Sequence, residues 1–388
     1  MRLKHNIIKQ IVAVAVFTMS LSAARAQVVF LPVFTQTRLE ARADFNYWNT
    51  HTAAGEIKEY GFQGRYFNFI AAGNLSEQFS YFFRQRIQAT PGTPSLFDNT
   101  DFLYLNYTPN KHWMFRLGKD ALAVGGFEYD AAPIDVLFST HYWDNFYCFQ
   151  LGAAAAYKSD NGNHTILLQV ANSPYVHYGA PVGTGLGQEF KSGLSSHSLF
   201  WSGKFGHFRT LYSVNLFERE EGRYMNYIAL GHEVSFDRWD LYLDLIHHAL
   251  AKDDWGKNFA VVSCMNVLLT DDLNFFVKGS YEQNHSEADY VNFSKYCRSL
   301  DCLVEAGHTY LLAGAGLEYR PKNCKNVRLH GFMAWRRTLD DSVFPVAPGG
   351  QVVGASTTTN TLNANMGITW DMDIHKMFKQ RLQDNAKS

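Results

Sequence analysis

The sequence contains no stretch of about 20 apolar residues, which is the length that a transmembrane helix needs. The apolar run at residues 11–17 is far shorter, so the chain could cross a membrane only with β-strands. The sequence also has no excess of either charge: 35 Lys and Arg residues balance 36 Asp and Glu residues, giving a formal net charge of -1. This balance gives no sign of a nucleic-acid partner, which we do not expect.

Cysteine is scarce, and motifs for metal binding or catalysis are missing. Five cysteines cannot all pair within one chain, and whether Cys297 and Cys302 close a small loop disulfide is left open. There is no C-x-x-C, H-E-x-x-H or G-x-S-x-G pattern. His247 and His248 would point to opposite faces of a strand, so they could not share a metal. We therefore expect no enzymatic activity, no cofactor and no bound metal.

The two ends of the chain differ from its middle. Arg2, Lys4 and Lys9 precede the short apolar run, and Ala24-Arg25-Ala26 has the form of a cleavage site. This order is typical of a secretory signal peptide, which we assign to residues 1–26. Residues 373–388 are polar, and we interpret them as a periplasmic tail.

Between these ends, apolar and polar residues alternate along segments long enough to be tilted membrane strands. From Arg38 to Trp48, alanines and aromatics share one face and charged side chains share the other. Further strands are predicted at about 58–72, after a loop at 49–57, and at Phe79–Ala89. A hairpin follows in which Leu103 and Leu105 share a face with Phe115 and Leu117 across the turn at residues 108–112.

Repeating this pattern to residue 372 gives sixteen strands. Short turns are expected at one end and longer loops at the other, with the longest loops at 120–145, 174–194, 284–307 and 339–359. Outer-membrane barrels have short periplasmic turns and long external loops, and closure removes every sheet edge. Aromatic residues also collect near strand ends, as a membrane-interface girdle requires. We predict an all-β fold: a sixteen-stranded antiparallel transmembrane β-barrel over residues 27–372.

Two segments resemble a known family. They are GFQGRYFNF with GNLSEQFSYFFRQRI, within residues 61–87, and LYLNYTPNKHWMFRLGKDALAVGGFEYD at residues 103–130. Both are similar to the phosphate-selective porin family (porins O and P). The resemblance implies a bacterial outer-membrane diffusion channel that is usually a homotrimer and prefers small anionic solutes. It also implies that the loop after Lys119 forms the constriction.

Strand parity assigns the basic residues to the lumen, because a charge facing lipid costs about 2–4 kcal/mol at the bilayer midplane. Arginine suits an anion path because it stays charged and offers paired donors to phosphate or carboxylate. The alternative for each arginine is a lumen charge paired with a neighbour, such as Arg42 with Glu40 or Asp44. The predicted solute-binding residues are Arg42, Arg65, Arg84, Arg86, Arg116, Lys119, Arg328 and Arg336.

The opposite wall carries inward carboxylates at Asp240, Asp244 and Glu282. A basic wall that faces an acidic wall is typical of general porins, so a non-selective porin remains an alternative. A second alternative is a non-conducting structural or adhesive barrel.

The long loop at residues 120–145 is predicted to fold into the barrel and narrow it. Its glycine pair permits a sharp bend, and its aromatic side chains could pack against the inner wall. Lys119, Asp120, Glu128, Asp130 and Asp135 would then border the narrowest point, unless the segment is an ordinary external loop. The residues assigned to this constriction are Gly125, Gly126, Phe127, Glu128, Tyr129 and Asp130.

Overall fold

The computed structural model describes residues 34–87, 99–145, 148–174, 193–220, 222–249, 255–285, 307–340 and 358–377. The predicted signal peptide, the Cys297–Cys302 pair and the tail beyond residue 377 lie outside these ranges, so those assignments remain predictions. Cys148, Cys264 and Cys324 lie within them as free thiols. Every helix of the described residues is too short or too polar to span a bilayer.

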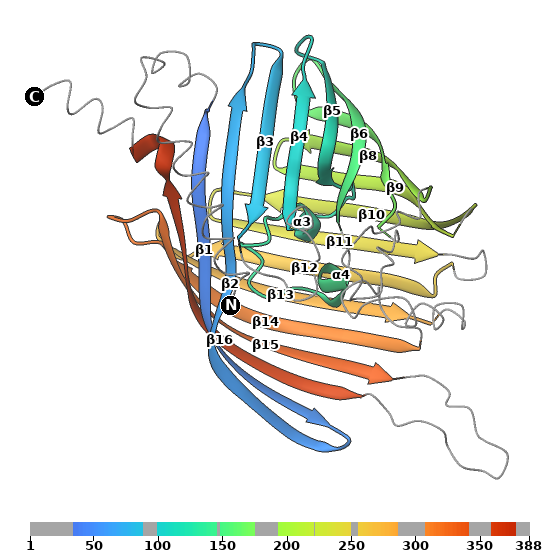
Figure 1. The fold of residues 1–388 in the computed structure, drawn as a ribbon. Helices are drawn as coiled ribbons and strands as arrows, with labels where there is room; N and C mark the ends of the chain where they lie inside the picture. Colours follow the sequence, from blue (N-terminus) through green and yellow to red (C-terminus); the bar gives the residue numbers. More distant parts are fainter. Residues whose placement is uncertain are drawn as a thin grey trace, which may run out of the picture.

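The described residues form one closed barrel of sixteen antiparallel strands, as predicted (Figure 1). Each strand pairs with its sequence neighbours, and β1 pairs with β16 to close the sheet. The strands are β1 (Gln36–Thr52), β2 (Gly55–Asn74), β3 (Phe79–Arg86), β4 (Thr100–Tyr107), β5 (Trp113–Ala121), β6 (Phe149–Lys158), β7 (His164–Asn172), β8 (Ser195–Phe205), β9 (Phe208–Glu220), β10 (Arg223–Ser235), β11 (Trp239–Ala249), β12 (Asn258–Leu268), β13 (Leu273–Asn284), β14 (His308–Tyr319), β15 (Val327–Asp340) and β16 (Thr359–Asp373).

The alternation of side chains produces an apolar outer surface. Strand parity that turns the arginines inward turns a set of seven apolar side chains outward. These side chains are all between 37% and 69% exposed, whereas Arg84, which has the opposite parity, is 7% exposed. This result confirms the assignment of faces. The outward set is Leu103, Leu105, Phe115, Leu117, Leu241, Leu243 and Ile368.

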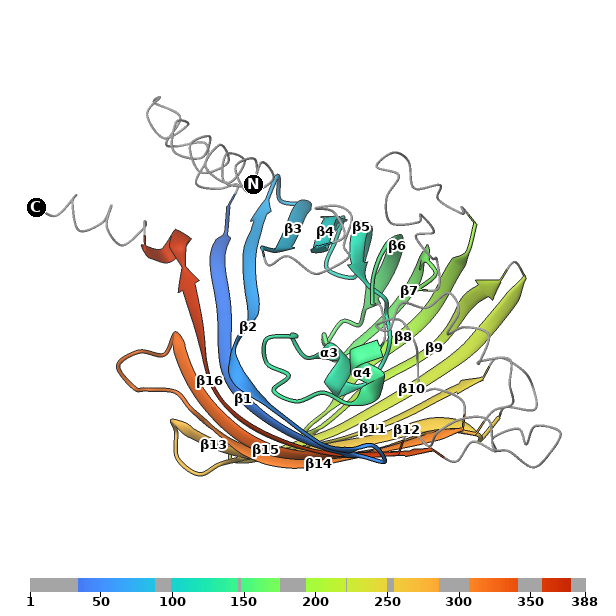
Figure 2. The same ribbon diagram turned by 60° about the horizontal axis from the view of Figure 1, so that its bottom comes forward.

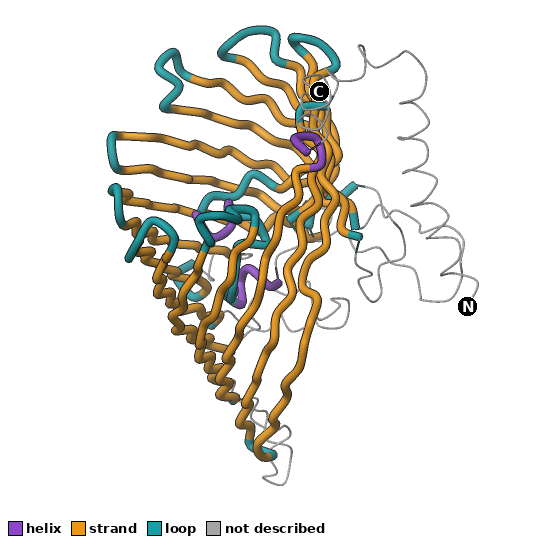
Figure 3. Tube along the Cα trace, turned by 90° about the vertical axis from the view of Figure 1, so that its left-hand side faces the viewer, coloured by secondary structure: helices purple, strands orange, loops and turns teal. Residues whose placement is uncertain are grey.

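The start of β1 and the end of β16 lie at the same end of the barrel, because Arg38 lies in register with Asp373. Turns at this end are short, and the loop-bearing end lies opposite (Figure 3). The predicted strict alternation of loop lengths is wrong at two hairpins. Thr52 pairs directly with Gly55, so most of the predicted 49–57 loop is strand, and β9 and β10 are separated by only two residues. Strand β3 ends at Arg86, three residues earlier than predicted.

Residues 122–145, which we call the inner loop, fold into the barrel between β5 and β6 (Figure 2). The loop contains two short helices, α3 (Phe127–Asp130) and α4 (His141–Asn145). The segment therefore lies inside the barrel as predicted and is not an ordinary external loop, while its role as the constriction remains a prediction. The barrel wall and this loop together form the candidate site.

Candidate functional site

The inner loop turns inward at its glycine pair. Gly126 has a φ of 104°, a conformation that only glycine adopts without strain. The Gly125 N–H donates to Ser213 Oγ (2.8 Å), and a Cβ at Gly125 would lie 2.4 Å from the Leu211 carbonyl oxygen. The backbone therefore approaches β9 more closely than any larger residue would permit, and the predicted bend is confirmed.

Two buried carboxylates hold the ends of the short helices. Asp244 on β11 accepts the N–H groups of Phe127 (2.8 Å) and Glu128 (2.9 Å). Glu282 on β13 accepts the N–H groups of His141 (3.0 Å) and Tyr142 (2.6 Å). Both carboxylates are 1% exposed. The prediction that they form an acidic face of the open lumen is therefore wrong, because they bind loop backbone instead.

A third buried carboxylate belongs to the loop itself. Glu128 is 4% exposed; it forms an ion pair with Lys278 on β13 and accepts hydrogen bonds from the Thr140 backbone N–H (3.0 Å) and Oγ1 (2.8 Å). Lys278 also donates to the Phe138 carbonyl oxygen (2.8 Å). Glu128 was predicted to border the narrowest point, but it ties two parts of the loop to the wall.

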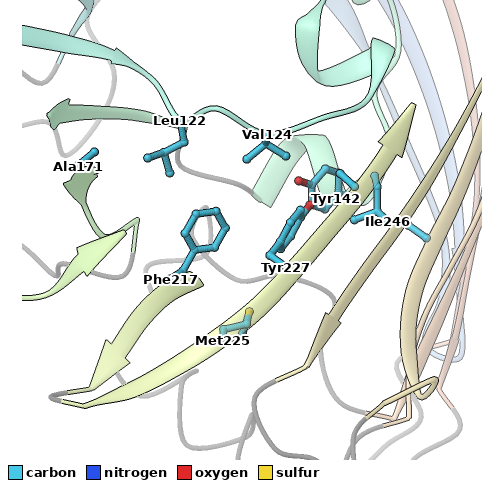
Figure 4. Packing of buried hydrophobic residues seen from close by; sticks show 10 residues of the cluster. Leu122, Val124, Tyr142, Ala171, Phe217, Met225, Tyr227 and Ile246 are labelled. Carbon is cyan, nitrogen blue, oxygen red and sulfur yellow. The ribbon is translucent and has the colours of Figure 1, made fainter. Parts of the chain in front are cut away.

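Apolar contacts also hold the loop against the barrel wall. Tyr142 packs near Tyr227 with ring centroids 5.6 Å apart, in a buried cluster that also contains Leu122, Val124 and Phe217 (Figure 4). In a second cluster, Phe138 packs between Phe276 and Phe332. The predicted packing of loop aromatics on the inner wall is thus confirmed, and each aromatic contact of this kind contributes about 0.5–1.5 kcal/mol beyond its buried area.

Arg42 also holds the loop against the barrel wall and does not line an open path through the lumen. It is 1% exposed, binds Asp44 (2.8 Å), and donates to the Val136 and Leu137 carbonyl oxygens (3.0 and 3.2 Å). His330 Nε2 lies 3.0 Å from Asp44. Of the two partners considered for Arg42, the structure selects Asp44.

Two arginines of β15, Arg328 and Arg336, also contact the inner loop. Arg328 pairs with Asp135 (2.9 Å) and with Glu318 (3.0 Å), and it is 5% exposed. Arg336 donates to the Ser139 carbonyl oxygen (2.8 Å) and lies 3.3 Å from the Asp144 carboxylate. Both arginines face inward as predicted, but each is matched by loop groups.

The wall from β2 to β5 carries the remaining basic residues. Arg84 and Arg86 share one carboxylate, Asp101, at 3.0 and 2.9 Å. The Arg84 guanidinium also lies over the Phe102 ring, 4.4 Å from its centroid, and over the more distant Phe149. The Arg84 side chain is 9% exposed and that of Arg86 is 28% exposed, so Arg86 is the more accessible charge.

Arg116 and Lys119 lie on β5. Arg116 forms an ion pair with Asp120, donates to Asn106 (2.8 Å), and lies 4.0 Å over the Tyr104 ring. Lys119 is only 2% exposed, although it lies in register with the outward Leu103 and Leu151. The prediction that Lys119 borders the narrowest point is wrong.

Arg65 occupies an irregular position in β2. The pairing of β1 with β2 shifts register between Arg42, which pairs with Tyr66, and Ala43, which pairs with Gly64. Arg65 is therefore an extra residue on β2. This bulge explains why the simple alternation of β2 failed. Arg65 is exposed and contacts Gln63 Oε1 at 3.5 Å, and Gln63 lies in register with the inward Asp44.

Three other carboxylates of the loop keep part of their surface open to solvent. Asp130, Asp135 and Asp144 are exposed, while Tyr129 packs against Trp143 with centroids 6.3 Å apart. The partly buried His141 ring stacks on the Tyr310 ring with centroids 3.8 Å apart; desolvation, with smaller effects from Arg336 and His308, lowers its pKa to about 3. The imidazole is therefore neutral at physiological pH.

Sequence reasoning missed three residues of the site. Lys278, Asp101 and His330 each bind a partner that the sequence places far away or on another strand. Lys278 shares its inward parity with Glu282, so strand alternation could have identified it. The partner of Asp101 depends on a register shift between Arg84 and Gln85 that alternation does not predict.

The matches with known proteins agree with this architecture. The family model for phosphate-selective porin O and P matches residues 35–254, which is more than half of the chain. No curated protein sequence matches the chain significantly.

Among solved structures, the outer membrane channel DcaP of Acinetobacter baumannii is similar with a TM-score of 0.58 and 11% sequence identity, over 87% of this chain and 96% of that one. Pseudomonas putida OprB has a TM-score of 0.56 and 10% identity, over 91% and 97% of the chains. OmpT of Vibrio cholerae in its trimer form has a TM-score of 0.50 and 11% identity, over 86% and 98%. At these identities the likeness concerns the fold alone.

Proposed function

Because the chain belongs to the phosphate-selective porin O and P family, and is therefore a channel of the bacterial outer membrane rather than an enzyme, we propose that it passes small anionic, phosphate-like solutes by passive diffusion. The proposed path runs between the inner loop and the wall formed by β2–β5.

The position of the inner loop supports this path. Its hydrogen bonds and ion pairs come from β1, β7, β9, β11, β13 and β15, which hold it against one side of the barrel. The wall from β2 to β5 carries Arg65, Arg86 and Arg116, which keep part of their surface accessible. Low-dielectric walls focus the field of such charges and raise the local concentration of counter-ions.

The observation that carries the proposal is the exposed guanidinium of Arg65. Its contact is the neutral Gln63, whereas Arg86 and Arg116 lie beside carboxylates. Several weak sites in series also suit conduction, because an ion must be able to leave each site. Anion preference therefore depends on groups such as Arg65 more than on the buried Arg84.

Solute uptake by liposomes tests the proposal. Swelling rates with anionic, neutral and cationic solutes of equal size should rank the anion first for the unchanged protein. Arg65→Gln should reduce that preference without lowering uptake of the neutral solute. A matched control is Arg238→Gln, in the turn between β10 and β11 at the end of the barrel where β1 begins, which should leave the ranking unchanged. Equal swelling with all three solutes would contradict anion preference.

A general, non-selective porin is the second candidate. It is favoured by the pairing of Arg42, Arg84, Arg116 and Arg328 with carboxylates, since paired charges cancel most of their field at a distance. In that case Arg65→Gln would not change the relative swelling rates.

We further propose that the chain assembles as a homotrimer in the lipid bilayer. One solved relative of similar fold is described as a trimer form, and this state is usual for the family that the sequence resembles. The signal peptide at 1–26, the barrel limits at 27–372 and the periplasmic tail at 373–388 remain part of the same proposal.

A further inference from the structure

The wall of the barrel is uneven in height next to β2. This strand pairs with β1 along residues 55–72, but with β3 only along residues 68–74. One further bond joins the Ile87 N–H to the Phe67 carbonyl oxygen (2.8 Å), and beyond it no described residue pairs with β2 on that side. Residues 55–66 therefore form a free strand edge, and the β1–β2 hairpin continues past the end of β3 (Figure 1).

The strands that follow this hairpin are unusually short. Strands β3 and β4 contain 8 residues each and β5 contains 9, whereas β1 and β2 contain 17 and 20. A tilted membrane strand needs about 9–11 residues. Strands β3 and β4 do not reach this length, so lipid cannot be the only neighbour of this side of the barrel through the whole thickness of the membrane.

The outward side chains of β2 indicate the depth of the free edge. Near the hairpin tip, Glu56 and Lys58 form an ion pair (3.0 Å). Further along the same face, Tyr60 and Phe62 are 76% and 91% exposed. A change from charged to aromatic residues is typical of the membrane interface. The edge beyond Tyr60 thus lies at the depth of the hydrocarbon, where lipid offers the backbone no hydrogen bonds.

The segment that follows β3 is too short to cover this edge. The eleven residues between Ile87 and Asn99 lie outside the described ranges, and they must leave and return at one place, because the Arg86 N–H donates to the Asn99 carbonyl oxygen (2.9 Å). Out and back, they reach roughly 18 Å along an edge of roughly 40 Å. Any strand that they added would itself become a free edge, since β4 and β5 do not continue past the end of β3.

We propose that a second copy of this chain covers the free edge of β2 and the outer face of β3 and β4, and thereby closes the wall of the solute path beside Arg65. Arg65 lies within the unpaired stretch, so the wall on its β3 side is incomplete in a single copy. A neighbour at this depth must itself be embedded in the membrane, as a copy of this barrel is. The inference rests on the proposed homotrimer and the proposed path, and it adds that the path is complete only in the assembled protein.

Native mass spectrometry of the purified full-length protein in a mild detergent tests the contact. Phe62→Gln places a polar side chain on the proposed contact surface. It should raise at least tenfold the protein concentration at which half of the chains are in trimers.

Phe259→Gln is the matched control. Phe62 packs against the Phe45 ring (centroids 5.1 Å apart), and Phe259 packs in the same way against Tyr281 (5.8 Å), but on β12, far from β2 around the barrel. This variant should leave the trimer unchanged. Equal effects of the two substitutions, or no effect of either, would overturn the proposal.

Amide exchange reports on the edge itself. In trimers of the unchanged protein, the N–H groups of residues 57–66 should exchange as slowly as those of the paired residues 68–74. In Phe62→Gln monomers about half of them should exchange freely, because successive N–H groups of an antiparallel strand point to opposite sides. Fast exchange of this stretch in the unchanged trimer would overturn the proposal, and this measurement decides even if Phe62→Gln does not fold.

Reversal potentials separate this inference from the proposed anion preference. In single-channel recordings Phe62→Gln monomers should have a reversal potential closer to zero, although Arg65 is unchanged. An unaltered value would show that one copy holds a complete path, against the proposal. If the unchanged protein has no anion preference but Phe62→Gln still dissociates the trimer, the preference fails and the contact stands. A monomeric unchanged protein would refute the assembly and this inference together.

Discussion

The charges of the lumen are mostly neutralised residue by residue. Arg42 lies against Asp44, Arg328 against Glu318 and Asp135, and one aspartate serves both Arg84 and Arg86. An arginine in such a pair acts on a passing ion as part of a dipole, whose field falls off faster than that of a single charge. The effective charge of the wall is therefore smaller than its number of arginines suggests.

The face of each strand residue sets the cost of adding a charge. Leu103→Arg places a guanidinium on the outer face of β4, where Leu103 is 46% exposed, and should destabilise the barrel by about 2–4 kcal/mol if it lies near the midplane. Tyr107→Arg, on the same face at the end of β4, should cost only about 0–1 kcal/mol. Urea unfolding in lipid vesicles measures both, and equal losses would contradict the assigned depth.

His141 makes the packing of α4 against the barrel wall sensitive to acid. Its pKa is about 3 when the loop is packed against the wall, mainly because of burial, whereas the usual value is 6.5. The stability that the neutral imidazole contributes is present in full above pH 6.5, and it is lost as the pH falls from 6.5 towards 3.

We compare the amide exchange rates of residues 139–145 with those of the His141→Phe variant at the same pH, because this ratio cancels the intrinsic effect of pH. We expect the ratio to be higher at pH 4.5 than at pH 7.5. Hydrogen–deuterium exchange with mass spectrometry measures this ratio. A ratio that does not change with pH would show that His141 does not stabilise the packing of α4 against the barrel wall.

Among the structural elements, the inner loop depends most on individual anchors. Asp244→Asn keeps the size of the side chain but loses the charge in two hydrogen bonds to the α3 backbone, and bonds to charged groups contribute about 1.5–3 kcal/mol each. We expect a less fixed loop and a noisier single-channel current.

Asp240→Asn is the control for this prediction. Asp240 lies on the same strand and face, but it accepts a hydrogen bond from Asn266 of the neighbouring strand and holds no loop backbone. Its current should match that of the unchanged protein. Equal noise in the two variants would mean that Asp244 does not fix the loop.

The elements were largely predictable from sequence, whereas the partners within the site were not. Alternation at Leu103 and Leu105 or at Leu241 and Leu243 has one solution in a barrel, since a shift of one residue would turn apolar side chains into the lumen. Asp244 and Glu282 also have the correct parity in the sequence. Nothing local indicates that they bind backbone more than 100 residues away, because that depends on the inner loop's path.

Arg65 and Lys119 show a second limit. The bulge at Arg65 changes side-chain parity, and Lys119 is buried although it lies in register with the outward Leu103 and Leu151. Neither feature departs visibly from an ordinary strand sequence. The Gly125-Gly126 pair was recognisable because two adjacent glycines rarely serve any purpose other than a close bend.

At the scale of the whole molecule, the closed barrel exposes an apolar outer surface that lipid or other subunits must cover. We expect the protein to be extracted from membranes as a trimer. Native mass spectrometry from a mild detergent should give one dominant species of three chains. A dominant monomer at all detergent concentrations tested would contradict the proposed assembly.

Reversal potential in a planar bilayer tests the central claim most directly, namely that small anions pass between the inner loop and the β2–β5 wall. Purified protein should give stepwise conductance, and in a potassium chloride gradient the reversal potential should have the sign of chloride selectivity. Arg65→Gln should move it towards zero. A reversal potential at zero or of cation-selective sign in the unchanged protein, or the absence of conductance steps, would contradict the account.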